Sequence, residues 1–175
     1  DRCRRHDRRA IEQLHRLTFS LVMGLCRRYR RSEDEVRAAH NGAFLKIVQN
    51  LDKYRPEVPF DSWAKRVTIN YLIDEWRRRR DHFAELEAAE AATRSTHNDF
   101  LEAEEAERLE AALHQLPPMT RTVFNLYAID GYDHAEIGRM LDMSPATSRW
   151  HLMEARKKLA ALLGLKPGVK NRNHG

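Results

Sequence analysis

A short stretch near the end of the sequence, from Ser144 to Arg156, combines hydroxyl, basic and aromatic side chains at a spacing that suits nucleic-acid recognition. Arg149 can form a bidentate hydrogen-bonded pair with guanine, and the hydroxyl groups of Ser144 and Thr147 can donate to phosphates. Side chains of these types on the first turns of a helix reach base edges in the DNA major groove. The candidate groove-facing residues are Ser144, Thr147, Ser148, Arg149, Trp150, Met153 and Arg156.

The elements that must hold these residues are a short helix, a tight turn and a longer helix over residues 134–163. Asp133 and Glu136 form the pattern of a capping box, and Ser144 is a typical N-cap for the second helix. This pattern predicts a helix-turn-helix whose second helix enters the major groove. The alternative is an ordinary antiparallel helix pair in which Trp150 packs on a neighbouring helix.

The sequence lacks the residue clusters that catalysis or metal binding would need. Its nine histidines are scattered, the pattern HExxH is absent, and the two cysteines, Cys3 and Cys26, form no CxxC. We therefore expect no catalytic residue, no bound metal and no cofactor. Idle thiols, the absence of an apolar leader and the absence of an apolar run of roughly 18 residues predict a cytoplasmic protein without membrane insertion.

Helical periodicity dominates the first half of the chain, and no stretch alternates apolar and polar residues as a strand does. Ser32 and Glu35 form a second capping-box pattern, and two prolines predict a loop over residues 52–59. The expected helices of this half cover residues 7–30, 32–51 and 61–80. The expected core stripe of the first helix is Ile11, Leu14, Leu17, Leu21 and Leu25.

Charge is distributed in three blocks along the 175 residues, whose formal net charge is +5. Residues 1–84 carry 20 basic and 12 acidic side chains, and residues 111–175 carry 9 basic and 5 acidic ones. Between them, residues 85–110 carry 2 basic and 9 acidic side chains. Two basic lobes fit a polyanion such as a nucleic acid, although solvated helix faces produce the same excess.

The segment 81–105 is rich in Ala and Glu and has too few large apolar residues to hold a core. We therefore interpret it as an acidic linker between two small helical domains, residues 1–80 and residues 106–175. The expected fold class is all-α, with the helix-turn-helix in the C-terminal domain.

Two ordered segments carry a more specific pattern. The first, FLKIVQNLDKYRPEVPFDSWAKRVTINYLIDEWRR, contains Phe44, Pro59-Phe60, Trp63, Arg66, Asn70, Asp74 and Arg77. The second, LPPMTRTVFNLYAIDGYDHAEIGRMLDMSPATSRWHLMEARKKL, contains Leu116-Pro117, Phe124, Gly131, Ala135-Glu136-Ile137, Leu141, Ser144, Thr147, Leu152, Ala155-Arg156 and Leu159. At these spacings the chain resembles the extracytoplasmic-function (ECF) subfamily of bacterial RNA polymerase sigma factors over nearly its whole length.

The resemblance implies a promoter-specificity subunit whose partners are core RNA polymerase and promoter DNA, and which is not an enzyme. In the family, the first domain docks on the polymerase clamp and captures the unpaired non-template strand of the minus-10 element. The last domain reads the minus-35 duplex, and the linker threads the polymerase channels. An anti-sigma factor is a further expected partner.

Two competing interpretations remain. A free-standing helix-turn-helix regulator would bind duplex DNA without polymerase and use residues 1–80 for dimerisation or sensing. A nucleic-acid enzyme such as a recombinase would need a nucleophile or a metal cluster, for which the sequence offers no pattern.

Family correspondence places the pocket that captures a flipped minus-10 base in the loop 52–59. An aromatic ring in this loop offers a stacking face, and an arginine offers a phosphate contact. The amide of Asn70 can read a base edge, unless it serves as a cap or in the core. Phe60 and Trp63 are expected to build the core. The expected strand-binding set is Tyr54, Arg55, Lys65, Arg66, Asn70, Arg77 and Arg78.

One segment departs from the family pattern. Many members have an Asp-Leu-Val-Gln-Glu-like stretch on their main polymerase dock, where this chain has Ala38-Ala39-His40-Asn41-Gly42. Asn41 keeps an amide, whereas Gly42 weakens a helix. Either the interface has drifted or the docking relies on Arg37, His40 and Asn41.

Overall fold

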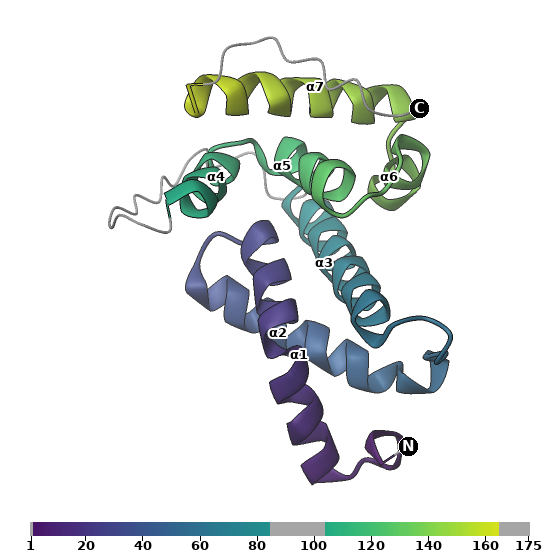
Figure 1. Ribbon diagram of the computed structural model, residues 1–175. Helices are drawn as coiled ribbons and strands as arrows, with labels where there is room; N and C mark the ends of the chain where they lie inside the picture. Colours follow the sequence, from purple (N-terminus) through teal and green to yellow (C-terminus); the bar gives the residue numbers. More distant parts are fainter. Residues whose placement is uncertain (1, 85–103, 165–175) are drawn as a thin grey trace. The chain divides into compact units, whose positions relative to one another are not determined.

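The computed structural model of the chain describes residues 2–84 and 104–164. The regular secondary structure of those residues consists of helices, which are joined by short loops (Figure 1). The chain divides into two compact units, Asp1–His97 and Asn98–Gly175. The all-α fold class expected from the periodicity is therefore confirmed. Most of the expected acidic linker, residues 85–103, lies outside the described residues.

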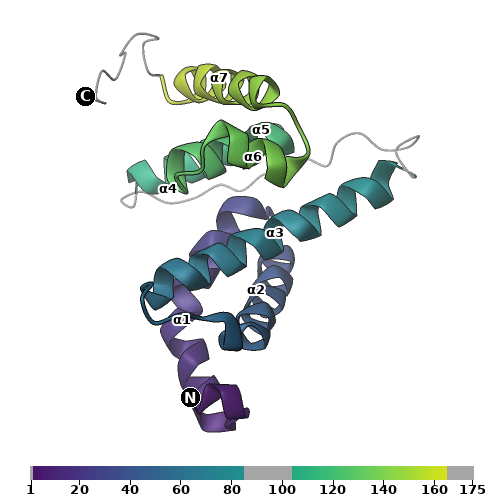
Figure 2. The ribbon, with the colours of Figure 1, turned by 90° about the vertical axis from the view of Figure 1, so that its right-hand side faces the viewer.

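The first unit is built on three helices: α1 (Arg8–Tyr29), α2 (Glu33–Gln49) and α3 (Phe60–Ala84). Two short 3₁₀ turns accompany them: η1 (Cys3–Arg5) and η2 (Leu51–Lys53). Each of the three helices contacts the other two, as Figure 2 shows. Side chains from all three helices form the core, which includes Val22, Ala43, Ile47, Ile69 and Leu72.

Local hydrogen bonds set where the helices of this unit begin. Asp7 caps α1 by accepting a hydrogen bond from the amide of Ala10 at 3.1 Å. The hydroxyl of Ser32 accepts from the amide of Glu35 at 3.2 Å, and the Glu35 carboxylate accepts from the Ser32 amide at 3.3 Å. This reciprocal pair is the capping box expected at Ser32, and it is confirmed.

The stripe expected to face the core from α1 is partly wrong. Leu25 is buried as expected, but Leu17 is 76% exposed, and the other buried residues of α1 are Thr18, Val22, Cys26 and Tyr29. Thr18 is tolerated in the interior because its hydroxyl donates to the carbonyl of Leu14 at 2.9 Å. Apolar periodicity does not predict a threonine on the buried face of a helix, which is why it places Leu17 there instead of Thr18.

An ion pair joins the end of α1 to α3. The guanidinium of Arg30, which is 6% exposed, lies 2.6 Å from the carboxylate of Glu75. Arg79 lies 3.5 Å from Glu75 and 3.1 Å from Glu35. Burial raises the pKa of the nearby Cys26 thiol to about 12, with Arg30 opposing this shift and Glu75 adding to it. This thiol therefore stays protonated and unreactive near neutral pH.

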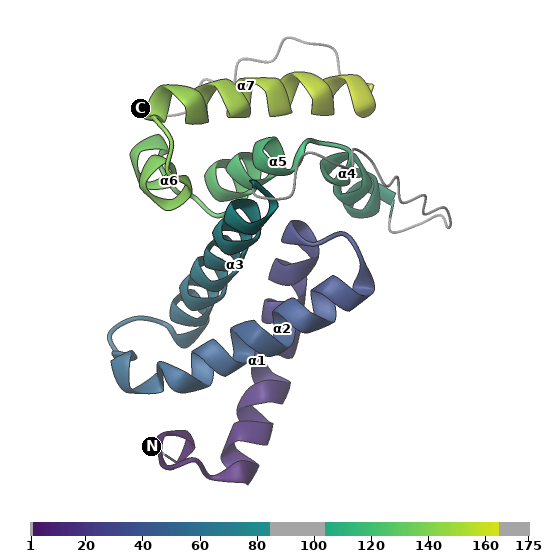
Figure 3. The same ribbon diagram turned by 180° about the vertical axis from the view of Figure 1, so that it is seen from behind.

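The second unit contains α4 (Glu104–His114), α5 (Pro118–Phe124), the π-helical turn η3 (Asn125–Ile129), α6 (His134–Leu141) and α7 (Pro145–Leu162). Helix α7 contacts α4, α5 and α6, and it lies across them in Figure 3. The fully buried side chains of this unit include Leu116, Val123, Leu126, Ile137 and Leu141.

Helix α5 continues directly into the π-helical turn η3. The amide of Asp130 donates to the carbonyl of Asn125, and the amide of Tyr132 donates to the carbonyl of Leu126, both at 2.9 Å. The wider turn brings the side chain of Tyr127 against α6, where its ring stacks on His134.

Candidate nucleic-acid interface

The turn between α6 and α7 is held by hydrogen bonds within a few residues. The Asp133 carboxylate accepts from the amide of Glu136 at 2.7 Å, which completes the capping box expected at the start of α6. Asp142 then takes a left-handed conformation with φ 55°, and the amide of Met143 donates to the carbonyl of Gly138 at 3.0 Å. A Cβ atom on Gly138 would lie 2.6 Å from the Met143 carbonyl oxygen, so the turn requires glycine there.

The first turns of α7 begin at Ser144, whose hydroxyl accepts from the amide of Thr147 at 3.0 Å. The Ser144 and Thr147 hydroxyl groups also lie 2.8 Å apart, and both residues are exposed. Beyond them Arg149, Trp150 and Met153 are exposed as well. The structure therefore presents these five expected readers on the outer surface of α7.

Ser148 does not belong to this exposed set, which corrects the sequence expectation. It is fully buried, and its hydroxyl lies 2.9 Å from Nδ1 of His134. This contact joins α7 to the start of α6. A side chain enclosed between two helices cannot reach a base edge, so Ser148 positions the second helix instead.

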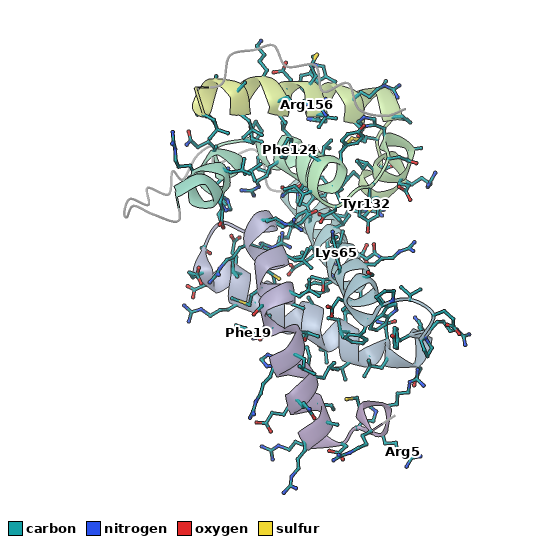
Figure 4. All side chains as sticks on the ribbon, viewed as in Figure 1. Arg5, Phe19, Lys65, Phe124, Tyr132 and Arg156 are labelled. Atoms are coloured by element: carbon teal, nitrogen blue, oxygen red, sulfur yellow. The ribbon has the colours of Figure 1, made fainter. Side chains whose placement is uncertain are left out.

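The side chains of His134 and Arg156 both lie against the ring of Tyr127. The His134 ring stacks on Tyr127 with centroids 4.4 Å apart, and the Arg156 guanidinium lies 6.0 Å from the Tyr127 centroid. Figure 4 labels Arg156 on α7. Partial burial, and then the positive charge of Arg149, lower the pKa of His134. The neutral imidazole is therefore favoured beside these arginines.

In the first unit, a groove of about 680 Å³ lies between α2 and α3. It brings together three of the expected strand-binding residues, Asn70, Arg77 and Arg78. Sequence reasoning did not assign the other polar side chains of this groove to a binding surface, because they come together only through the packing of two helices. The residues missed are Lys46, Asn50, Tyr71 and Asp74.

The close packing of α2 on α3 explains Gly42. The hydroxyl and ring carbon of Tyr71 occupy the space that a Cβ atom on Gly42 would need. The glycine expected to weaken α2 therefore provides room for a tyrosine at the groove. Neither residue predicts this contact by itself, because they lie on different helices.

The loop between α2 and α3 is organised by three aromatic rings. The Tyr54 ring packs on Phe60 and Trp63 with centroid distances of 5.2 and 5.3 Å, and its hydroxyl donates to the carbonyl of Val58 at 3.0 Å. Arg55 is exposed in this loop. Tyr54 is half-buried, so one part of it remains accessible while the other part supports the loop.

The remaining expected strand-binding residues lie on α3. Arg66 is exposed, whereas Lys65 is half-buried and is labelled in Figure 4. Among the lining residues of the groove, Asn70 is exposed and Asp74 accepts at its carbonyl from Arg78 Nε at 3.3 Å. The exposed amide of Asn70 favours surface recognition over a role in the core.

Comparison with known proteins identifies the family of the chain. Residues 11–82 match Sigma-70 region 2, and residues 106–159 match Sigma-70, region 4. The ECF RNA polymerase sigma factor SigM of Mycobacterium tuberculosis is 30% identical over 168 residues, which cover 95% of this chain and 84% of that protein. The chain belongs to the ECF RNA polymerase sigma factors.

Other relatives agree with this assignment. The ECF RNA polymerase sigma-E factor of Haemophilus influenzae is 25% identical over 171 residues, covering 91% of this chain and 90% of that protein. The fold is also similar to that of the sigma factor RpoE of Bartonella quintana, solved in complex with the anti-sigma factor NepR. That match has a TM-score of 0.60 at 14% identity and covers 89% of this chain and 97% of the other.

This sigma factor therefore binds core RNA polymerase and directs promoter-specific initiation of transcription. Region 2 coincides with the unit that carries the α2–α3 groove, and region 4 coincides with the unit that carries the helix-turn-helix. The family assignment supports this function and not the free-standing regulator.

The expected polymerase dock on α2 needs one correction. His40 is 3% exposed, and its ring packs edge-on against His15 and Phe19 with centroid distances of 5.1 and 5.0 Å. Burial is the main cause that lowers the pKa of His40. His40 is therefore part of the interior, while Arg37 and Asn41 of the same helix are exposed.

Two further observations concern the described residues as a set. Within residues 2–84 and 104–164, no three His, Cys, Asp or Glu side chains gather in a way that would hold a metal ion. None of the helices that the structure describes is long and apolar enough to cross a membrane.

Proposed function

We propose that this sigma factor reads the minus-35 duplex with the first turns of α7. The observation that carries the proposal is the division of α7 into two faces. Leu152 and Ala155 are buried with Ser148, whereas the readers on the other face are exposed. The proposed reading set is Ser144, Thr147, Arg149, Trp150, Met153 and Arg156.

We assign binding of the unpaired minus-10 strand to the first unit. Its unpaired bases meet the groove between α2 and α3, where the Asn70 amide recognises a base edge and Arg77 and Arg78 hold the phosphates. Tyr54 and Arg55 contact the strand from the loop before α3, and Lys65 and Arg66 extend the contact along α3. The basic excess of residues 1–84 supports this assignment.

Core RNA polymerase docks on the outer face of α2 through Arg37 and Asn41, which are exposed. An anti-sigma factor covers the basic faces of this chain and keeps it from polymerase, and the complex of Bartonella RpoE with NepR supports this partner class. The chain contributes no catalytic chemistry of its own, and it acts in the cytoplasm with polymerase.

In vitro transcription on a promoter library tests the proposed function. The chain with core polymerase is expected to initiate at a defined set of promoters, and core polymerase alone is not. The chain without polymerase is expected to bind the same promoters weakly. Tight, sequence-specific duplex binding by the chain alone would favour a free-standing regulator instead.

A further inference from the structure

The exposed face of α7 is apolar at its centre. Trp150 and Met153 are 52% and 56% exposed, more than any other large apolar side chain described in the second unit. They are three positions apart, so they lie on the same face of the helix. Ala146, one turn before Trp150, is also exposed on this face. We name Ala146, Trp150 and Met153 the apolar strip.

The Trp150 ring is held in place on this surface. It packs edge-on against the ring of His151 with centroids 4.8 Å apart. Nδ1 of His151 lies 3.1 Å from the hydroxyl of Thr120 on α5. A tryptophan supported in this way is preorganised, so binding a ligand costs it little side-chain entropy.

Exposed cations flank the apolar strip. Arg149 precedes Trp150, and Arg156 and Lys157 follow Met153 by one turn. Positive charge beside an apolar face complements a polyanion that also presents an apolar group. Duplex DNA meets this description, because thymine presents its C5-methyl group in the major groove.

We propose that Trp150 and Met153 recognise thymine methyl groups in the minus-35 element, within a base pair or two of a guanine read by Arg149. The inference rests on the proposed reading of minus-35 DNA by α7, and it names the base class that the strip selects. The flexible thioether of Met153 adapts to a methyl group, and the fixed ring of Trp150 limits where that group can lie. The methyl contact excludes water from both partners.

Replacement of thymine by uracil tests the proposal, because it removes only the methyl group. The sigma factor with core polymerase is assayed on its best promoter from the library, with one minus-35 thymine at a time replaced by deoxyuridine. Binding of the holoenzyme at subsaturating concentration is expected to fall about three- to fivefold at one or two positions. The Met153→Ala or Trp150→Ala variant is expected to bind the thymine and uracil templates equally at its position.

A control variant and a second readout separate the possible outcomes. Leu162→Ala truncates a 44% exposed side chain at the far end of α7 and is expected to keep the full thymine-to-uracil difference. The preference of each variant for guanine opposite Arg149 is measured on the same library, and it is expected to persist if the helix still docks. A variant that loses this preference is replaced by the conservative change Trp150→Phe or Met153→Leu.

The inference and the proposed function fail in different ways. A library without any minus-35 preference would overturn the proposed function. A clear minus-35 preference that contains no thymine would overturn the inference alone. Equal binding of the unmodified chain to the thymine and uracil templates would do the same. A methyl dependence that survives in both alanine variants would also overturn it.

Discussion

Arg149 and Asn70 are two side chains to which we assign base recognition, one in each unit. Both are exposed, on different units, and each has the hydrogen-bonding groups for a base edge. His40 and Ser148 are polar as well, yet they are buried and contact other side chains of their own unit. Residue type alone therefore does not separate readers from positioning residues.

Arg149→Ala is expected to weaken recognition of the minus-35 element by about 1–3 kcal/mol and to relax the sequence preference at one base pair, because a bidentate pair with guanine is lost. Transcription with core polymerase on promoters randomised at minus-35 measures this. Lys158→Ala, another exposed cation of α7, should lower affinity evenly for all sequences. An unchanged preference in the Arg149 variant would remove this residue from the reading set.

Asn70→Ala is expected to leave binding to the closed duplex intact and to impair promoter opening, because the amide contacts a base only after the strands separate. The rate of open-complex formation by the holoenzyme measures the effect. Gln49→Ala changes an exposed amide on α2 that does not line the groove and should have no effect. Normal opening by the Asn70 variant would contradict its role in strand capture.

The stability of the first unit is expected to depend on pH through His40. Burial lowers the pKa of His40 in the folded state, so the unfolded chain takes up a proton first as the pH falls. The free energy of unfolding is therefore highest above the usual histidine pKa of about 6.5 and decreases below it. Urea unfolding at several pH values is expected to show a weaker decrease for His40→Leu than for the unmodified chain.

The neighbourhood of His40 supplies the control for this experiment. His15 faces His40 from α1, and Asn41 lies 3.4 Å from its Nδ1 atom. His6 is exposed and far from this cluster in sequence, so His6→Asn should retain the full pH dependence. An identical slope for His40→Leu and the unmodified chain would mean that other groups cause it.

At the scale of the element, the turn between α6 and α7 determines the direction in which the exposed face of α7 points. Capping at Asp133 and Ser144 sets the start of each helix, and the close approach of Gly138 to Met143 sets the path between them. The hydrogen bond between His134 and Ser148 then joins the two helices through their side chains. Local and tertiary interactions both act on this one element.

Gly138→Ala is expected to destabilise the protein by about 1–3 kcal/mol, because the new Cβ would meet a backbone carbonyl oxygen that cannot move aside independently. Gly24→Ala, in α1, has open space around the new Cβ and should stabilise by about 0.5–1 kcal/mol through helix propensity. The midpoint of urea unfolding measures both changes. Equal shifts of the same sign would contradict the close-approach argument.

At the scale of the whole molecule, two basic stretches of sequence, residues 1–84 and 111–175, are separated by an acidic one. Residues 85–110 hold 9 acidic and 2 basic side chains, whereas the segments on either side have a basic excess. We expect the basic stretches to contact DNA and the acidic stretch to occupy a path that later carries RNA. The charge pattern is a property of the sequence and needs no assumption on the position of the units.

Replacing the acidic residues of segment 85–105 with glutamine is expected to alter the ratio of abortive to full-length transcripts, because the repulsion between this segment and the nascent RNA is lost. In vitro transcription with core polymerase measures this ratio. Replacing only the glutamates of this segment with aspartate, with Asp99 retained, keeps the charge and should leave the ratio unchanged. A glutamine variant with normal promoter escape would show that the charge has no role.

Much of the fold follows from interactions between residues close in sequence. The capping boxes at Ser32 and Asp133 and the cap at Ser144 were predictable, because each bond spans three residues. The π-helical turn at η3, which contacts α6, was not predictable, since no turn residue in its own sequence marks it.

The amino-acid sequence by itself determined the all-α class, the helix starts and the family, because these depend on short-range hydrogen bonds, periodicity and ordered motifs. Only the tertiary structure decided which polar residues face outward. The burial of Ser148 and His40, the exposure of Leu17 and the groove between α2 and α3 depend on which helices pack together. Such contacts join residues distant in sequence, and no local spacing encodes them.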